Sequence, residues 1–190
     1  MATLEIEAKS TALILIDLQQ GIVALPTAPY SSAEVVQRAA ALAAAFREKG
    51  GTVVYVRVDL ANMLRLPVDS PARDPNAPPP PASASELVPE AGRQAGDVLI
   101  TKRQWGAFFG TDLEQQLRQR GIRKIVLGGI ATNYGVESTA RAAVGLGFEL
   151  VVVEDATASL TATLHRFPHE HIFPRIGRVR TTAEVIAALT

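Results

Sequence analysis

Short, uninterrupted apolar runs alternate along the chain with longer stretches in which apolar residues recur every three or four positions. The runs are rich in Val, Ile and Leu and are continuous rather than alternating, which is typical of parallel strands buried on both faces. Five runs, and a sixth expected near the end, lie at residues 12–16, 53–56, 98–100, 125–127, 150–153 and 176–179.

The stretches between these runs predict helices. The longest places Val35, Ala39, Leu42 and Phe46 on one side, with a serine before it as the N-cap and a glycine pair after it as the stop. A Thr-Asp-Leu-Glu capping box is expected to start the next helix. The helices are expected at residues 32–49, 111–120, 136–146 and 181–189.

Because strands and helices alternate, the sequence predicts an α/β fold: a three-layer αβα sandwich around a six-stranded, mostly parallel, doubly wound sheet. Residues 1–190 are expected to form one domain, since strands on both sides of the middle segment are needed for one sheet. That middle segment, residues 59–97, is a Pro-rich excursion with eight of the twelve prolines. A connection of this length is usually functional or disordered, so a lid or oligomer contact and a plain surface excursion both stay open.

The amino-acid composition excludes several classes of function. Basic and acidic residues are equal in number, 19 each, so nothing indicates nucleic-acid or anionic-membrane binding. The absence of cysteine excludes a disulfide framework, a zinc-thiolate site and a thiol nucleophile. No apolar run approaches the ~20 residues of a membrane span, and the first ten residues lack the features of a signal peptide. We therefore expect a cytoplasmic protein without membrane contact.

Three polar features lie at the carboxyl ends of predicted strands, where doubly wound sheets bind their ligands. Asp17 ends the first strand, Lys102 ends the strand at 98–101, and a turn at 131–135 leads from the next strand into a helix. A carboxylate, an ammonium and backbone N–H donors can therefore converge there. Taken singly, Asp17 could be a turn residue and Lys102 a surface lysine; their joint placement favours a site.

Aromatic residues follow Lys102 directly. Trp105 and Phe108 are expected to wall a flat or ring-shaped substrate, whereas Phe109 is expected in the core. Asp59 also ends a strand, but a solvated loop aspartate is favoured there, and Asp155 is expected to serve a turn or a helix cap.

Three histidines, His165, His169 and His171, form a His-x3-His-x-His cluster late in the chain. This spacing could bind a metal in principle, but no distant carboxylate or histidine completes a ligand set. Surface or packing histidines, far from the crevice, are the favoured interpretation.

At this point the chain resembles the isochorismatase-like hydrolases of the cysteine hydrolase superfamily, over nearly its whole length. Three segments carry the resemblance, in the order 11–19, 102–113 and 129–141. More closely, the chain resembles a branch of bacterial hydrolases with glycine at the nucleophile position. In most of the family an Asp, a Lys and a Cys form an amidase triad, and the matching positions here are Asp17, Lys102 and Gly135.

The resemblance also implies a cis peptide bond between Ile130 and Ala131, which would turn the N–H groups of Tyr134 and Gly135 into the crevice. It places Gln19, Asn133 and Tyr134 beside the substrate, together with the two aromatic residues named above.

Two positions depart from the isochorismatases proper, since Asn133 stands where they have histidine and Asp59 where they have glutamine. A negative charge at position 59 would disfavour a dicarboxylate substrate. The metal triad of nicotinamidases is broken because Ala61 replaces a histidine, so we expect no metal and no cofactor.

Without a thiol, acyl-enzyme chemistry has no nucleophile. The resemblance instead implies hydrolysis of a small ether or enol ether without a covalent step, with Asp17 as the acid and Lys102 holding its charge and position. A catalytically silent small-molecule binder and a scaffolding oligomer are the alternatives. Relatives assemble as dimers or tetramers, so a homodimer or homotetramer is expected.

Overall fold

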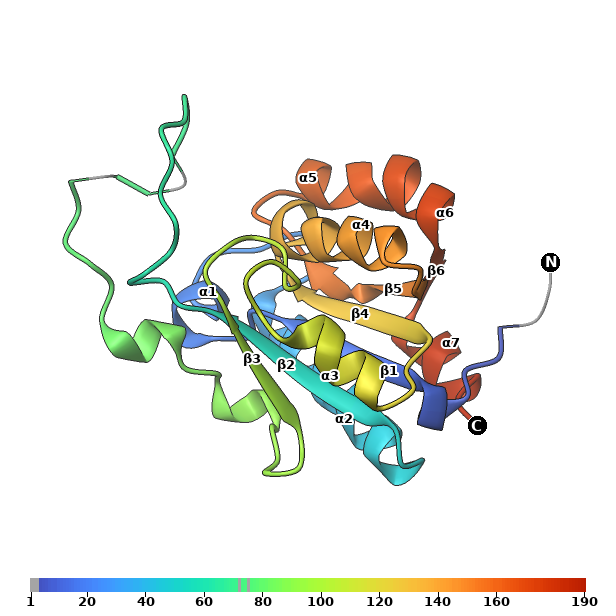
Figure 1. Ribbon diagram of the computed structural model, residues 1–190. Coiled ribbons are helices and arrows are strands. Elements are labelled where there is room, and N and C mark those ends of the chain that lie inside the picture. The colour runs from blue at the N-terminus through green and yellow to red at the C-terminus, as the bar shows by residue number, and fades with distance from the viewer. Residues whose placement is uncertain (1–3, 72, 75) are drawn as a thin grey trace.

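The computed structural model describes residues 4–71, 73–74 and 76–190, and its centre is a six-stranded sheet (Figure 1). The strand order is β3-β2-β1-β4-β5-β6, and every neighbouring pair runs parallel. The predicted doubly wound α/β sheet is therefore confirmed. The strands are β1 (Thr11–Ile16), β2 (Thr52–Val58), β3 (Val98–Lys102), β4 (Lys124–Ile130), β5 (Glu149–Ala158) and β6 (Arg178–Arg180).

Helices cover both faces of the sheet and complete the three layers (Figure 1). One face carries α2 (Ser32–Glu48) and α7 (Thr182–Ala187); the other carries α3 (Leu113–Gln119), α4 (Glu137–Gly145) and α6 (Phe173–Ile176). Among the described residues, no helix combines the length and apolarity needed to cross a bilayer. The shorter helices are α1 (Gln20–Val23), α5 (Ala162–Phe167), η1 (Ala8–Ser10), η2 (Ala82–Ser85), η3 (Pro89–Ala91), η4 (Thr132–Val136) and η5 (Pro168–Ile172).

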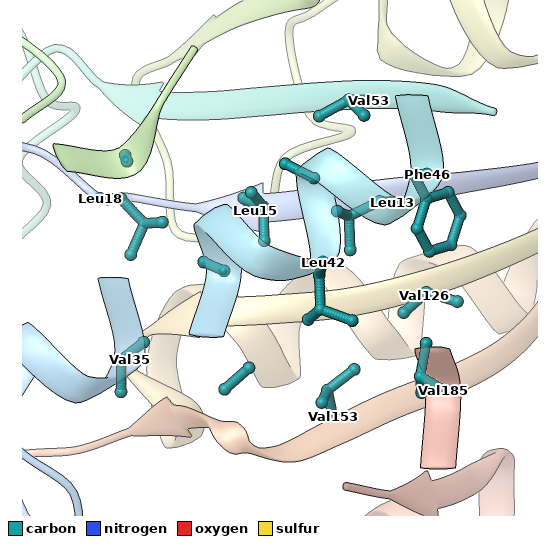
Figure 2. Packing of buried hydrophobic residues seen from close by; sticks show 14 of the residues in the cluster. Leu13, Leu15, Leu18, Val35, Leu42, Phe46, Val53, Val126, Val153 and Val185 are labelled. Carbon is teal, nitrogen blue, oxygen red and sulfur yellow. The ribbon is translucent and has the colours of Figure 1, made fainter. Parts of the chain in front are cut away.

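Helix α2 owes its position to a regular apolar stripe. Val35, Leu42 and Phe46 point from α2 toward the strands, where they meet Leu13 and the rest of the first core cluster (Figure 2). Ser31 caps the helix by accepting the Glu34 N–H, and the Glu34 carboxylate accepts the Ser31 N–H in return. The sequence pattern predicted both the apolar stripe and the serine N-cap.

Strand β1 is a central strand of the sheet. All six of its residues are buried, because Leu13 and Leu15 face α2 while Ile14 and Ile16 face the second cluster, which contains Leu113 of α3. Burial on both faces explains why the run is continuous rather than alternating.

Two helical expectations need correction. The capping box expected at Thr111 does not form, because the Thr111 hydroxyl donates to the Ala107 carbonyl and accepts the Leu113 N–H, so that α3 begins two residues later than expected. Residues 162–176 carry no predicted helix, yet α5, η5 and α6 lie there. Pro168 and Pro174 interrupt the apolar periodicity of that stretch, which hides it from a pattern-based assignment.

The Pro-rich excursion extends away from the sheet over its first half and returns along it over the second (Figure 1). On its return the Val88 N–H donates to the Leu18 carbonyl, the Gln20 N–H donates to the Glu86 carbonyl, and the Ser85 hydroxyl accepts the Leu60 N–H. The returning half therefore packs beside the carboxyl end of β1.

Gly129 lets β4 approach β1 closely. Its φ is +116°, and a Cβ there would lie 2.2 Å from the Ile16 carbonyl oxygen. The pairing register between β4 and β5 shifts between Leu127 and Gly129, so the carboxyl ends of these strands depart from a regular ladder just before the turn that follows β4.

We expect Gly129→Ala to destabilise the protein by more than about 3 kcal/mol, because backbone overlap adds to an unfavourable φ. Gly110→Ala is the matched control: φ is +68°, no atom of the described chain lies within 4 Å of its Cβ position, and the cost should be about 1 kcal/mol. Urea unfolding measures both. Equal losses would contradict the close approach.

Candidate active site

The sheet brings three chain segments together at one edge. Strand order reverses between β1 and β4, and ligands of such sheets bind outside the carboxyl ends at this reversal. Asp17 follows β1, the turn at 131–135 follows β4, and Lys102 is the last residue of β3. The side chain of Lys102 reaches past the end of β2 to meet Asp17.

Asp17 and Lys102 form a buried ion pair. Lys102 Nζ lies 2.8 Å from Asp17 Oδ2 and donates a second hydrogen bond to the Trp105 carbonyl at 2.7 Å. Lys102 is 1 % exposed and Asp17 is 6 % exposed. Burying two such groups so far from water is costly unless they lie against each other, as they do here.

The Asp17 carboxyl is in an unusual state. Burial raises the pKa of Asp17 above its ordinary value, and the nearby Lys102 ammonium opposes that rise without cancelling it. Its second oxygen, Oδ1, is buried and has no hydrogen-bond partner among the described residues. This side chain therefore holds a proton more readily than an exposed aspartate does, and it has an oxygen available to carry it.

The backbone at Asp17 is also unusual. Its φ is +54°, a left-handed conformation that aspartate tolerates better than most residues. The conformation is fixed from both sides, since the Asp17 N–H donates to the Val56 carbonyl and the Gln19 N–H donates to the Asp17 carbonyl.

Gly135 lies directly over the ion pair. A Cβ at this position would lie 2.9 Å from Lys102 Nζ, 2.9 Å from Ile16 Cγ2 and 3.1 Å from Asp17 Oδ2. The space that a side chain would fill at position 135 is therefore already occupied, because the lysine ammonium lies against the glycine backbone. Any side chain here must displace part of the pair.

The turn between β4 and α4 begins at a cis peptide bond, Ile130–Ala131, and continues as η4. The expectation that the Tyr134 N–H faces the crevice is wrong: this N–H donates to the Ala131 carbonyl at 3.1 Å, and so does the Val136 N–H at 3.2 Å. The tight turn uses these donors internally, so Tyr134 contributes no backbone oxyanion contact.

Thr139 ties the turn to the loop that follows Lys102. Its buried hydroxyl donates to the Gly135 carbonyl at 2.7 Å and accepts the Ala107 N–H at 3.1 Å. Sequence reasoning missed this residue, because a threonine one helical turn after the tip carries no distinguishing signal.

Aromatic side chains border the site. The rings of Trp105 and Tyr134 make an edge contact with centroids 5.0 Å apart, and Trp105 is 48 % exposed. One of the two phenylalanines differs from expectation. Phe109, expected in the core, is 64 % exposed, whereas Phe108 stacks on Phe148 within the second core cluster. A substrate contact by Phe108 stays a prediction.

Gln19 acts within the scaffold. Its buried amide donates to the Val58 and Ala84 carbonyls and accepts the Val58 N–H. It joins the ends of β1 and β2 to the returning excursion, and these three bonds occupy most of its hydrogen-bonding capacity.

Two further predicted positions lie beside the site with defined partners. Asn133 accepts a hydrogen bond from Ser159, which follows β5. Asp59 is solvated, as expected: its carboxylate accepts from Asn62 and lies 3.8 Å from Arg103. These contacts with Asn62 hold the pKa of Asp59 below its ordinary value.

Asp155 and the three histidines near the end of the chain have different surroundings. Asp155 accepts the Thr182 N–H and hydroxyl at the start of α7, the cap role expected of it. His165 is buried, and its Nδ1 lies 3.0 Å from the Thr132 hydroxyl, so the expectation that all three histidines lie far from the crevice is wrong. Over the described parts of the chain, no three His, Asp or Glu side chains are arranged to hold a metal ion.

Two open hollows lie at the opposite end of the sheet. One of about 540 Å³ is lined by Glu7, Arg123 and Lys124 near the starts of β1 and β4, and one of about 370 Å³ by Thr52 and Val98 at the starts of β2 and β3. Neither includes a residue of the ion pair, so they are separate from the site.

Known proteins are similar to this chain in sequence and in fold. Residues 11–184 match the isochorismatase domain family. The uncharacterised isochorismatase family protein YecD of Escherichia coli O157:H7 is 50 % identical over 198 residues, covering 98 % of this chain and all of YecD. The uncharacterised isochorismatase family protein YwoC of Bacillus subtilis strain 168 is 48 % identical over 98 % of this chain and 97 % of its own. An isochorismatase family protein from Burkholderia thailandensis has a TM-score of 0.90 at 44 % identity, with 98 % of both chains covered. The chain belongs to the isochorismatase family.

Proposed function

We propose that this protein hydrolyses a small ether or enol ether without a covalent intermediate, with Asp17 as the acid. The observation that carries the proposal is the buried Asp17 carboxyl, which is paired with Lys102 through one oxygen and unpartnered at the other. A general acid needs a pKa near the working pH and a position against its substrate. Burial at the carboxyl edge of the sheet supports both requirements.

The proposed reaction on an enol ether has three steps. Asp17 gives its proton to the terminal enol carbon, and the adjacent carbon becomes an oxocarbenium ion. Water then adds to that carbon and returns a proton to the Asp17 carboxylate. The resulting hemiketal breaks its bond to the ether oxygen, which releases an alcohol and a ketone. No thiol takes part, in keeping with a chain that has no cysteine.

Each neighbour has a proposed part in this reaction. Lys102 stabilises the Asp17 carboxylate after it has lost its proton, and the Trp105 carbonyl keeps the ammonium in place. Gly135, which we propose occupies the position of the family's cysteine, lets the pair lie against the backbone. The exposed face of Trp105, with Tyr134 at its edge, would contact a planar substrate.

A catalytically silent binder is the second candidate. The observation that favours it is the closure of the site: Lys102 and Asp17 are almost fully buried, and the Tyr134 N–H and the Gln19 amide already have partners. Assembly as a homodimer or homotetramer, cytoplasmic location and activity without metal or cofactor stay predictions under either function.

Asp17→Asn should lower turnover at least about a hundredfold, because it removes the acid while asparagine tolerates the left-handed backbone. Pyruvate release from isochorismate measures this. Asp112→Asn, an exposed change at the start of α3, should keep wild-type turnover. Turnover by Asp17→Asn close to the wild-type rate would contradict the acid role, and no release by the wild type would exclude isochorismate as the substrate.

A stability control belongs with this variant, since Asp17→Asn leaves the buried Lys102 charge without its partner, at a cost of about 3–5 kcal/mol. Combining it with Lys102→Met removes both charges and should restore most of the stability, as measured by urea unfolding. Turnover should stay lost in the double variant.

The proposed acid role fixes the sign of the pH dependence. Because Asp17 acts in its protonated form, kcat/KM should be highest below the pKa of the site and should fall as the pH rises through it. Burial raises the pKa of Asp17, so the fall should occur at a higher pH than for an exposed aspartate. A kcat/KM profile that increases with pH over this range would instead indicate a carboxylate acting as a base.

Gly135→Ala should lower kcat roughly tenfold or more, because the new methyl must displace Lys102 Nζ or Asp17 Oδ2 from a 3 Å approach. Gly145→Ala, at the end of α4 with no described atom within 4 Å of its Cβ position, is the control. Gly135→Cys distinguishes the two candidate functions: amide hydrolysis gained by this variant, with no ether hydrolysis by the wild type, would favour the silent binder.

A further inference from the structure

A second buried polar cluster lies next to the candidate site, between β5, α5 and the turn η4. Its centre is His165, whose side chain joins two groups from distant parts of the chain. His165 Nδ1 lies 3.0 Å from the Thr132 hydroxyl, and His165 Nε2 lies 3.0 Å from Glu154 Oε1. The residue is 3 % exposed; its contact with Thr132 is buried, and its contact with Glu154, whose side chain is 29 % exposed, is partly buried.

The partners of Glu154 fix the orientation of the imidazole. The Tyr30 hydroxyl donates to the Glu154 carboxylate at 2.9 Å, and Arg38 covers the Tyr30 ring at 4.5 Å. Hydrogen bonds from His165 and then from Tyr30 hold the pKa of Glu154 below its ordinary value. An ionised carboxylate only accepts hydrogen bonds, so Nε2 of His165 carries a proton toward it, and in the neutral tautomer Nδ1 accepts the Thr132 hydroxyl proton.

His169 is an internal comparison for His165. The two rings are 4.5 Å apart, but His169 contacts Thr157 instead of the turn. The Thr157 hydroxyl donates its single proton to the Glu154 carbonyl, so it accepts from His169 Nε2. Burial and the neighbouring His165 lower the pKa of His169 to about 4. His169 is therefore a neutral packing residue.

Thr132 is the point at which the cluster meets the site. It is fully buried and lies after the cis peptide bond at Ala131 and three residues before Gly135. Helix α5 packs against this turn, and Ser159 donates to the adjacent Asn133. Residues from the C-terminal part of the chain therefore contact the turn that places Gly135 over the ion pair.

We propose that His165 is a positioning residue for the candidate site: oriented by Glu154, it holds the Thr132 hydroxyl and thereby sets the path of the turn that places Gly135 against Asp17 and Lys102. The inference rests on the proposed function for its consequence in catalysis. The geometric part concerns the turn alone and can be tested without a substrate.

The protein contains its own reporter of this turn. Trp105 is the chain's single tryptophan, and its ring contacts Tyr134, two residues after Thr132. Its carbonyl accepts the Lys102 hydrogen bond. Emission from Trp105 therefore responds to the position of the turn relative to the ion pair.

The experiment compares one substitution at two adjacent rings. The Nε2 of glutamine can replace the histidine Nε2 but not Nδ1, so His165→Gln keeps the Glu154 bond and loses the Thr132 bond, while His169→Gln keeps the Thr157 bond. We expect His165→Gln to shift Trp105 emission and increase its quenching by acrylamide, and His169→Gln to match the wild type. His165→Asn, whose Oδ1 can replace Nδ1 but which cannot replace the Nε2 contact to Glu154, should change the signal less than His165→Gln does.

A double variant tests whether the effect passes through Thr132. Thr132→Val removes the hydroxyl and keeps the side-chain shape, so it should change Trp105 emission as His165→Gln does, and the double variant should show no further change. For a substrate that the wild type turns over, His165→Gln should lower kcat roughly tenfold or more with KM within about twofold.

Three results would overturn the proposal: wild-type Trp105 emission and quenching in His165→Gln, equal changes in His165→Gln and His169→Gln, or a change in His165→Asn at least as large as in His165→Gln. Circular dichroism and urea unfolding confirm that each variant is folded at the temperature used. Failure of the proposed function gives a different pattern, in which the Trp105 results hold while the wild type turns over no ether.

Discussion

The burial of an ammonium beside a carboxylate is the constraint on which the rest of the site depends. Lys102 and Asp17 are separated from water by the sheet, the turn after β4 and the loop after β3, and either charge left alone there would cost several kcal/mol. Their 2.8 Å contact combines a lysine long enough to reach past β2, a left-handed backbone at Asp17 and the close approach of the Gly135 backbone to the ammonium. These local features, unusual one by one, satisfy a single requirement.

The sheet supplies the rigidity that this requirement needs. Its parallel strands are buried on both faces by α2 and by α3 and α4, so their ends are fixed before any site residue is considered. Hydrogen bonds from Gln19, Thr139 and Ser159 then bind the loops to those ends. The chemistry lies on loops, but these hydrogen bonds tie the loops at the site to the framework.

The sequence pattern predicted the framework well and the contacts within it poorly. Continuous Val, Ile and Leu runs predicted five strands, and the weaker pattern at 176–179 indicated the sixth. The strand ends and the family resemblance both predicted that Asp17 and Lys102 come together, as they do, because strand ends and charged residues are visible in a single chain. From the sequence, Gly135 could be predicted only as a position that lacks the family's thiol. Its packing against Lys102 is visible only in the three-dimensional structure. His165 drew attention only as part of a histidine cluster; its contacts could not be predicted, since its partners Thr132 and Glu154 are 33 and 11 residues away. The core assignment of Phe109, which is 64 % exposed, was wrong because adjacent residues in an irregular loop have no period to follow.

The strand order has a consequence for synthesis of the chain. Strand β1 is made first, yet it takes a central place with β2 on one side and β4 on the other. The edge that β4 covers stays open until residues 124–130 have been translated, more than a hundred residues later. During that interval a mostly apolar strand presents unpaired backbone groups to its surroundings, the kind of surface that invites pairing with other chains. The same central burial that stabilises the site in the finished protein therefore leaves the incomplete chain with an open, pairing-prone edge until β4 is made.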